Sequence, residues 1–341
     1  MAYTVTLQPS GHTYPVPADT TLLQAALDAG LTLPYGCRDG ACGACKATLV
    51  AGQVDHGKAQ EHALPLTERA SGNVLTCCAR PLSDVILEVR EVRSQTDIPV
   101  RTMPCRVHEL RKVAADVMVL RLKLPSNERL QFLAGQYVEF LLPDNKRRAF
   151  SLANAPHEDE ILELHVRFIP GGSFTEQVFS TMKVKDILRF EGPLGTFRLR
   201  EESTKPMVMV AGGTGFAPIK ALVEHAIHNH SARPIAIYWG AKNRAGLYLP
   251  ELPMNWAAVH SNISYVPVLS EPAESDAWTG RTGLVHEAVL ADFADLSGHQ
   301  AYVCGAPVMV EAAQRDFAGR GLPADQFFAD IFSYAAKAEK K

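Results

Sequence analysis

The chain is organised around the stretch Cys37-Arg38-Asp39-Gly40-Ala41-Cys42-Gly43-Ala44-Cys45, in which three cysteines are spaced C-x4-C-x2-C. A fourth cysteine, Cys77, lies far downstream. This is the spacing of plant-type [2Fe–2S] sites, where one loop presents three thiolates to the irons. The small residues between the cysteines allow the backbone to bend closely around inorganic sulfur. The pattern therefore predicts a [2Fe–2S] cluster bound by Cys37, Cys42, Cys45 and Cys77.

A zinc knuckle and a set of disulfides are the two alternatives for these cysteines. Zinc sites usually pair two C-x2-C units, and this chain has a single one. After the four cluster cysteines are assigned, Cys78, Cys105 and Cys304 remain. An odd remainder, in a chain whose N-terminus lacks a signal peptide, favours a reducing cytoplasm over a disulfide framework. We interpret Cys78 as a small buried residue behind the cluster rather than as an exchanged ligand.

The composition is that of an ordinary globular protein with more than one domain. The 341 residues exceed what one core usually holds, so two or three domains are expected. A formal net charge of −3 gives no indication of a nucleic-acid partner or of binding to an anionic membrane surface. No apolar run is long enough to span a bilayer, and we predict a cytoplasmic protein without membrane insertion.

Residues 1–93 have the pattern of a small mixed α/β domain. Alternating polar and apolar residues predict strands, and one short apolar face before Gly30 predicts a helix over residues 22–27. The predicted strands are residues 3–7, 11–16, 46–50 and 85–89. Residues 94–103 lack periodicity and carry a proline, so we predict a linker there.

Residues 104–202 are rich in short strands with Gly and Pro between them, which predicts an antiparallel barrel. In Arg148-Ala149-Phe150-Ser151, the arginine suits a pyrophosphate, the aromatic ring suits a flavin, and the hydroxyl suits flavin N5. The turn Gly172-Ser173-Phe174-Thr175 leads into a predicted helix, whose N-terminus can hold an anion. Each motif alone is weak, but together they indicate a flavin nucleotide.

Residues 203–341 follow a rhythm of strand, glycine-rich turn and helix. The apolar strand 206–210 leads through Ala211-Gly212-Gly213-Thr214-Gly215-Phe216-Ala217-Pro218 into a helix over residues 219–228. This places backbone amides at the carboxyl end of a buried strand, where nucleotide phosphates bind. Further predicted strands at 234–240, 263–269 and 301–307 complete an α/β doubly wound sheet. The turn lacks the G-x-G-x-x-G fingerprint of common dehydrogenases.

These motifs together resemble the ferredoxin–NADP reductase superfamily over nearly the whole chain. Its members carry R-x-[YF]-S, a G-x-x-[ST] turn, GGTG-x-AP and a Cys-Gly pair such as Cys304-Gly305. The order of domains is similar to that of oxygenase reductase components. The resemblance implies an α+β ferredoxin domain of the β-grasp type, an antiparallel β-barrel that binds FAD and an α/β domain that binds nicotinamide nucleotide. It also implies that electrons pass from NAD(P)H to FAD, then to [2Fe–2S], and then to a partner protein.

The same resemblance implies a set of site residues. Those expected close to the reacting rings are Ser151, Thr214, Cys304, Asp330 and Phe332. The other expected cofactor-binding residues are Arg148, Ala149, Phe150, His165, Val166, Gly172, Ser173, Phe174, Thr175, Gly212, Gly213, Gly215, Ala217, Pro218, Gly305 and Pro307. For the cysteine and for the C-terminal residues, ordinary burial at a strand end is the alternative explanation.

The nucleotide and the partner are less strongly indicated. Lys242 and Arg244 follow a strand and could reach a 2′-phosphate, but we interpret them as solvated loop charges and favour NADH over NADPH. Several stretches, such as Trp278-Thr279-Gly280, are similar to CDP-6-deoxy-3,4-glucoseen reductases, which supply electrons to a dehydrase in deoxysugar synthesis. Others resemble phenol hydroxylase reductases, so an oxygenase component is the alternative partner. A non-catalytic electron carrier or redox sensor is a third hypothesis, and the intact motifs argue against it.

Overall fold

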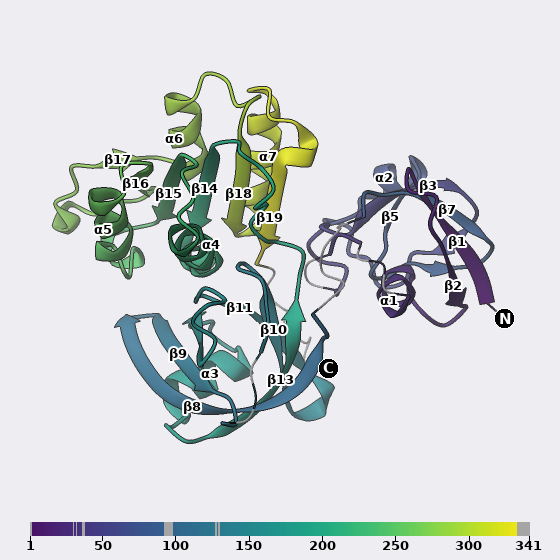
Figure 1. The fold of residues 1–341 in the computed structure, drawn as a ribbon, viewed down its shortest axis with the longest axis horizontal. Helices are drawn as coiled ribbons and strands as arrows, with labels where there is room; N and C mark the ends of the chain where they lie inside the picture. Colours follow the sequence, from purple (N-terminus) through teal and green to yellow (C-terminus); the bar gives the residue numbers. More distant parts are fainter. Residues whose placement is uncertain are drawn as a thin grey trace. The chain divides into compact units, whose positions relative to one another are not determined.

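A computed structural model describes residues 2–29, 31, 33–35, 38–91, 98–126, 128 and 130–332. The chain divides into two compact units, Met1–Pro99 and Val100–Lys341 (Figure 1). Cys37 lies outside the described residues, and so do residues 92–97, which include the first four residues of the expected linker. Among the helices described, none is both long and apolar enough to cross a membrane.

The N-terminal unit is a five-stranded mixed sheet with a helix against it. The sheet order is β2-β1-β7-β3-β5, and β1 pairs with β7 in parallel. The helix α1 begins after Thr21, whose hydroxyl accepts a hydrogen bond from Gln24 N, and it buries Leu22, Leu23 and Ala26. The expected α+β ferredoxin fold is confirmed. Element bounds are β1 Ala2–Gln8, β2 Thr13–Pro17, α1 Leu22–Asp28, β3 Lys46–Ala51, β4 Val54–Asp55, α2 Leu66–Ala70, β5 Asn73–Leu75, β6 Arg80–Pro81 and β7 Val85–Glu88.

The first half of the C-terminal unit is the expected antiparallel barrel. Its sheet order is β11-β10-β13-β8-β9-β12, and an antiparallel bridge between Leu152 and Leu164 joins the two ends of the sheet. Phe174 of α3 packs in the barrel core with Phe140 and Phe190. The bounds are β8 Arg101–Ala114, β9 Val117–Lys123, β10 Tyr137–Leu141, β11 Arg147–Ser151, β12 Ile161–Arg167, α3 Ser173–Ser180 and β13 Ile187–Leu194, with a 3-10 turn η1 at Pro143–Asn145.

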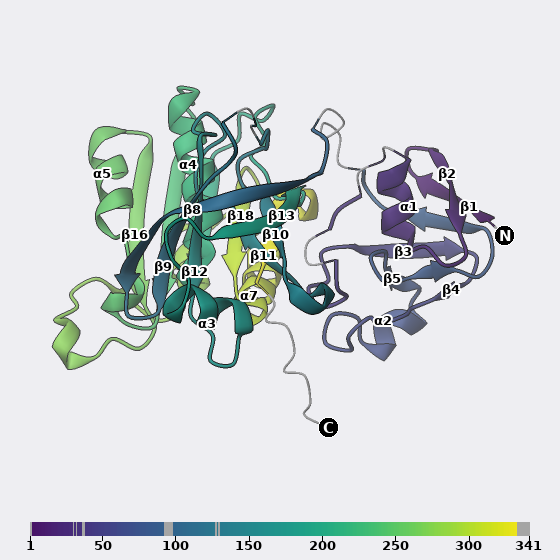
Figure 2. The same ribbon diagram turned by 90° about the horizontal axis from the view of Figure 1, so that it is seen from below.

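The barrel begins earlier than the sequence predicts. Residues 101–103, expected in the linker, belong to β8, which is the long strand that crosses the barrel in Figure 2. The physical reason is pairing, because Arg101 lies opposite Gly192 and Met103 lies opposite Phe190 of β13. The extension of the partner strand β13 therefore determines where β8 begins, and no local pattern in residues 101–103 signals it.

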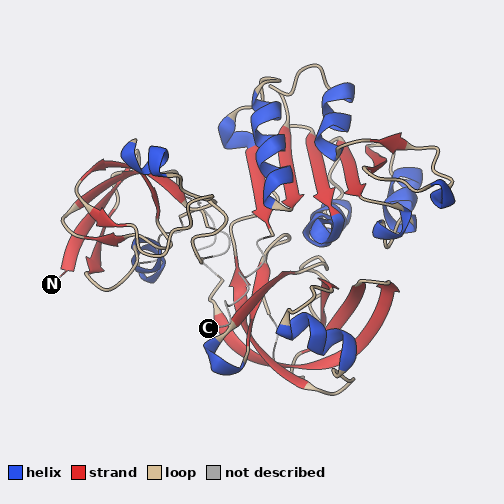
Figure 3. Ribbon diagram, turned by 180° about the vertical axis from the view of Figure 1, so that it is seen from behind, coloured by secondary structure: helices blue, strands red, loops and turns tan. Residues whose placement is uncertain are grey.

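The second half is a six-stranded parallel sheet in the order β17-β16-β15-β14-β18-β19. Helices cover both faces (Figure 3), and β14 alternates between them, with Met207 and Met209 in one core and Val208 and Val210 in the other. The doubly wound sheet is confirmed. The bounds are β14 Met207–Gly212, α4 Phe216–His228, β15 Ile235–Ala241, α5 Glu251–Val259, β16 Ile263–Leu269, β17 Arg281–Thr282, α6 Val285–Asp292, β18 Gln300–Gly305, α7 Pro307–Ala318 and β19 Phe327–Ile331, with short 3-10 turns η2 Gly213–Gly215, η3 Arg244–Gly246, η4 Glu274–Asp276 and η5 Ala324–Gln326.

The barrel and the parallel sheet share one hydrophobic core. Phe197 and Val117 from the barrel belong to the same buried cluster as Phe216 and Leu222 of α4. The expected domains 104–202 and 203–341 therefore pack together within one compact unit. This fixes the glycine-rich turn before α4 against the barrel.

Gly215, within that turn, provides a test of this packing. An alanine methyl group there would lie 2.2 Å from the backbone oxygen of Cys304 in β18. We expect Gly215→Ala to lower the free energy of unfolding by about 1–3 kcal/mol, because the overlap forces the backbone apart. Urea unfolding followed by tryptophan fluorescence measures this. Gly298→Ala is the control, since no atom lies within 4 Å of its added methyl group. Equal stability of the two variants would contradict the prediction.

Candidate functional site

Two of the expected cluster cysteines lie side by side inside the N-terminal unit, and a third is buried on the cluster loop. Cys42, Cys45 and Cys77 are all buried, and the sulfur atoms of Cys45 and Cys77 lie 3.2 Å apart. Two thiolates on one metal with bonds of about 2.3 Å lie roughly 4 Å apart, so these two sulfurs need to separate only slightly to bind one iron. Cys42, on the same loop, is then available to the other iron. These donors fit a [2Fe–2S] cluster, which when bound exchanges one electron at a time.

The backbone of the loop has the conformation that such a site needs. Gly40 has φ +73°, a left-handed conformation that favours glycine, and its carbonyl accepts a hydrogen bond from Gln60 N at 3.0 Å. His62 Nε2 lies 2.8 Å from Ala41 O, and Thr76 N donates to Cys45 O. These bonds tie the described part of the loop to the segments around it.

The cluster cysteines need a nearby cation to be stable as thiolates. The hydrogen bond with Cys45, then the one with Cys78 and burial, raise the pKa of the Cys77 thiol far above its ordinary value. A buried thiolate here is stable only beside a positive charge, which iron supplies.

In the C-terminal unit, three of the residues expected near the reacting rings come together. Ser151 Oγ, at the end of β11, donates a hydrogen bond of 2.7 Å to Asp330 Oδ2 in β19. Cys304 in β18 is fully buried and lies opposite Asp330 in the parallel ladder. Phe332 is the first residue after β19, and its N–H donates to Gly305 O at 2.8 Å. The barrel thus contributes the hydroxyl, and the sheet contributes the carboxyl and the thiol.

The pKa values of Asp330 and Cys304 suit proton transfer through the Asp330 carboxyl. Burial raises the pKa of Asp330 to about 6, against opposing hydrogen bonds from Ser151 and Cys304. Burial also raises the pKa of Cys304 well above its ordinary value, so this side chain stays a neutral thiol. A carboxyl with a pKa near neutrality, bonded to a hydroxyl, can pass a proton through Ser151 Oγ.

The glycine-rich turn is held from both sides. The Trp239 indole N–H donates to Gly213 O at 2.9 Å, and the Trp239 ring stacks on Phe216 with centroids 3.8 Å apart. Thr214 and Gly215 are buried, and so are Ala217 and Pro218 of α4. Gly212 lies at the end of β14, where an added methyl group would meet Met309 Sδ at 2.6 Å.

Arg167, at the end of β12, is a site residue that sequence reasoning missed. Its Nη1 donates to Asp116 Oδ2 at 2.8 Å, whereas its Nη2 is a buried atom without a hydrogen-bond partner in the described structure. The same Nη2 lies 3.2 Å from the position of a methyl group at Gly213. A guanidinium donor aimed at a glycine-rich turn fits a nucleotide phosphate. No motif marks this arginine, because only the tertiary fold brings it to the turn.

The expected FAD motifs occupy one side of the barrel. Arg148 is half-buried and Ala149 is exposed in β11, while Phe150 packs 5.2 Å from Phe174 between ring centroids. Ser173 is exposed at the first turn of α3, and Thr175 Oγ1 donates to Gly172 O at 3.0 Å. The arginine and the exposed start of α3 fit the phosphates of a dinucleotide, and FAD bound there supplies two-electron chemistry with nicotinamide and one-electron chemistry with the cluster. Gly305 and Pro307 lie at the end of β18 and the start of α7.

His165 and Val166 are enclosed by protein rather than presented to a ligand. Val166 is fully buried in the barrel core. His165 Nδ1 lies 2.8 Å from the Tyr248 hydroxyl, and its Nε2 lies 3.2 Å from Glu163 Oε1. Both ring nitrogens therefore have protein partners, which leaves the backbone of these residues as the part able to meet a cofactor.

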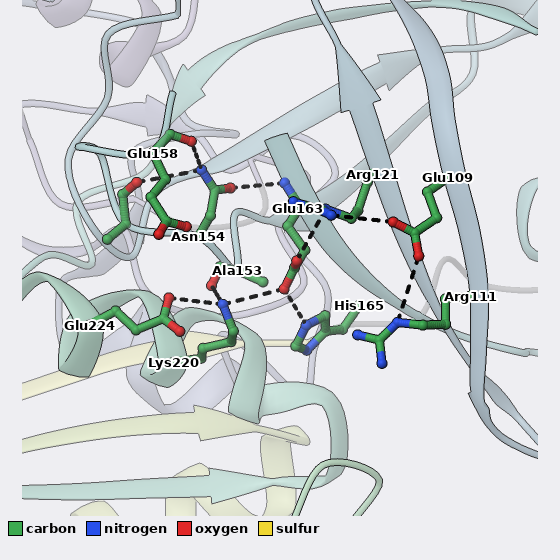
Figure 4. A network of polar contacts seen from close by, with 11 residues as sticks. Glu109, Arg111, Arg121, Ala153, Asn154, Glu158, Glu163, His165, Lys220 and Glu224 are labelled. Atoms are coloured by element: carbon green, nitrogen blue, oxygen red, sulfur yellow. Dashed lines mark hydrogen bonds and ion pairs between the residues drawn. The ribbon is translucent and has the colours of Figure 1, made fainter. Parts of the chain in front are cut away.

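His165 belongs to a buried polar network that joins the barrel to α4 (Figure 4). Lys220 Nζ of α4 lies 2.8 Å from Glu224 Oε2 and 3.3 Å from Glu163 Oε1 of β12, and it donates to Ala153 O at 3.1 Å. Burial alone would raise the pKa of Glu163, but the bond with His165 and the charge of Lys220 hold it at about 2. Burial raises the pKa of Glu224 to about 7. Sequence reasoning missed Lys220 as well.

Family models cover the chain in three consecutive segments. Residues 5–82 match the 2Fe-2S iron-sulfur cluster binding domain, residues 104–199 the oxidoreductase FAD-binding domain, and residues 209–315 the oxidoreductase NAD-binding domain. The expected order of domains and the three expected cofactors are confirmed.

Known proteins are similar to this chain over nearly its whole length. The CDP-6-deoxy-L-threo-D-glycero-4-hexulose-3-dehydrase reductase of Yersinia pseudotuberculosis is 41% identical over 97% of this chain and 99% of its own length. The reductase component of a Pseudomonas phenol 2-monooxygenase is 39% identical over 92% of this chain and 89% of its own. The crystal structure of an Amycolatopsis cytochrome P450 reductase has a TM-score of 0.80 at 35% identity and covers 98% of this chain and 100% of its own. Both expected resemblances are therefore confirmed.

The Asp330 carboxyl predicts that the rate of flavin reduction depends on pH. We expect the rate of flavin reduction by NADH to show an ionisation near pH 6 in the unaltered protein, and Asp330→Asn to lack it. The amide cannot exchange a proton, so the rate should also fall by about 100-fold. Stopped-flow absorbance across a pH series measures both effects. Asp325→Asn, an exposed carboxyl in the preceding turn, is the control. An unchanged pH profile in the Asp330 variant would refute the proton-transfer role.

The buried lysine predicts a large loss of stability. Lys220→Met removes the ammonium group from Glu224 and leaves Glu163 with only the guanidinium of Arg121, 3.6 Å away, so we expect the free energy of unfolding to fall by about 3–5 kcal/mol at neutral pH. The loss should grow as the pH rises above 7, because Glu224, whose pKa is about 7 beside Lys220, then becomes a carboxylate that the lysine stabilises. Lys242→Met, which removes an exposed partner of Glu271, should change stability little. A pH-independent loss for Lys220→Met would contradict this account.

Proposed function

Because this chain belongs to the family of three-domain reductases that join a [2Fe–2S] domain to FAD- and NAD-binding oxidoreductase domains, we propose that it delivers electrons from NADH to a dehydrase that deoxygenates a nucleotide-linked hexose. The observation that carries this choice is the 41% identity to the Yersinia dehydrase reductase over 97% of this chain and 99% of that protein. NAD(P)H-dependent electron transfer itself is common to the whole family. The electron-accepting partner is what differs among its members.

An oxygenase component is the second candidate for the partner. The phenol 2-monooxygenase reductase component is nearly as similar, at 39% identity, but it covers less of both chains. The FAD and nicotinamide halves serve either partner equally well, since they handle only the entry of electrons. The deoxysugar dehydrase is favoured by the additional matched length.

NADH is the proposed electron donor, on the basis of charges at the carboxyl ends of β15 and β16. Lys242 Nζ lies 3.5 Å from Glu271 Oε1, and Arg244 Nη1 donates to the carbonyl of Asp276 at 3.2 Å. Both cations that could meet a 2′-phosphate therefore already have protein partners. The carboxylate of Glu271 would accept a hydrogen bond from a ribose 2′-hydroxyl and repel a 2′-phosphate.

Roles for the site residues follow from the same proposal. Cys37 joins Cys42, Cys45 and Cys77 as the fourth cluster ligand. Arg148 and the start of α3 hold the FAD pyrophosphate, while the glycine-rich turn and Arg167 hold the phosphates of the nicotinamide nucleotide. Ser151 is the hydroxyl that would contact the flavin, and it donates a hydrogen bond to Asp330. No disulfide joins any of the cysteines that the structure describes, which suits work in the reducing cytoplasm.

The role of Glu271 predicts an exchange of nucleotide preference. We expect Glu271→Arg to raise kcat/KM for NADPH by at least about 10-fold and to lower it for NADH, since a guanidinium pairs with a 2′-phosphate. Steady-state cytochrome c reduction with each nucleotide measures the ratio. Glu274→Arg makes the same charge change on the following exposed turn and should leave the ratio unaltered. An equal effect of both variants would show that only net charge matters.

The partner is tested by direct transfer. The protein, reduced anaerobically with NADH, is mixed with a pyridoxamine-dependent hexose dehydrase and its CDP-sugar substrate, and separately with a phenol hydroxylase oxygenase component. The proposal expects rapid reoxidation and deoxygenated sugar in the first mixture and slow reoxidation in the second. Coupled phenol hydroxylation without sugar deoxygenation would replace the dehydrase with the oxygenase as partner.

A further inference from the structure

One cysteine of the N-terminal unit, Cys78, remains when four cysteines bind the cluster. It follows Cys77 directly, in a tight turn where the N–H groups of Cys78 and Ala79 both donate to Leu75 O, at 3.0 and 2.9 Å. The sulfur atoms of Cys77 and Cys78 lie 3.7 Å apart. Neighbouring side chains often diverge from the backbone, but here both thiols point to the same place.

The Cys78 thiol lies against the cluster loop. Cys78 is only 3% exposed, and its sulfur would lie 2.6 Å from a methyl group added at Gly40. The thiol is thus pressed against the backbone between the first two cluster cysteines of the loop. Its own carbonyl is packed as closely, 2.7 Å from a methyl position at Gly57. The main chain of Cys78 is therefore closely packed, so its sulfur changes position mainly by rotation about χ1.

We propose that Cys78 is a reserve ligand of the cluster. When the Cys77 thiolate is absent, the iron that Cys77 held forms an Fe–S bond to Cys78 Sγ, and the thiol proton of Cys78 passes to solvent. The required movement is small, because a change of χ1 rotamer displaces a cysteine sulfur by about 3 Å. The ligand set remains four thiolates, so the cluster keeps its type while its geometry and hydrogen bonds change.

The test compares variants of the full-length holoprotein by iron and sulfide content, visible circular dichroism and the EPR spectrum of the dithionite-reduced cluster. Cys77→Ala should retain about two irons per chain with an altered EPR spectrum. Cys78→Ala should match the unaltered protein. The double variant Cys77→Ala/Cys78→Ala should contain no cluster. Flavin content in each preparation shows that the C-terminal unit is folded.

Serine variants distinguish iron ligation by Cys78 from ligation by another donor. If Cys78 takes over, Cys77→Ser and Cys77→Ala give the same EPR spectrum, because their ligands are identical. Cys77→Ser/Cys78→Ala should then differ from both, since a serine oxygen is its sole replacement donor. The proposal is overturned if the two Cys77 variants lack iron while Cys78→Ala retains it. Different spectra for Cys77→Ser and Cys77→Ala would equally overturn it.

Discussion

The site in the C-terminal unit depends on one buried lysine. Lys220 comes from the helix that follows the glycine-rich turn, and its ammonium group lies between Glu224 of the same helix and Glu163 of the barrel. Burying three charges is costly, so the arrangement persists only while barrel and sheet remain in contact. The shared core around Phe216 and Phe197 excludes water from that contact. As a result, a hydroxyl from the barrel and a carboxyl from the sheet meet at 2.7 Å.

The sequence predicted those parts of the site in which the chemistry is local. The C-x4-C-x2-C loop, the R-A-F-S strand and the GGTG turn each carry their meaning within a few residues, and the three family models confirm the cofactors that they imply. The family resemblance also predicts Ser151, Cys304 and Asp330 as site residues. Their mutual contact is a property of the tertiary structure, because β18 and β19 pair far from β11 in the chain.

What the sequence could not reveal depends on partners distant in the chain. Arg167 resembles any arginine at the end of a strand until β12 brings it to Gly213. Lys220 looks like a polar residue in an amphipathic helix, although it is 8% exposed. The start of β8 at Arg101 is determined by pairing with β13, not by its own residues. The ion pair of Lys242 with Glu271 joins two strand ends whose proximity only the parallel sheet creates.

The central claim is that one chain carries electrons from NADH through FAD to its [2Fe–2S] cluster, and anaerobic stopped-flow reduction by NADH tests it most directly. Freeze-quenched samples from the same reaction report the cluster by EPR, while absorbance reports the flavin. The account predicts that the flavin band bleaches first and that the EPR signal of the reduced cluster then appears without any added mediator. A flavin that is reduced while the cluster stays oxidised, in a protein with full iron content, would contradict it.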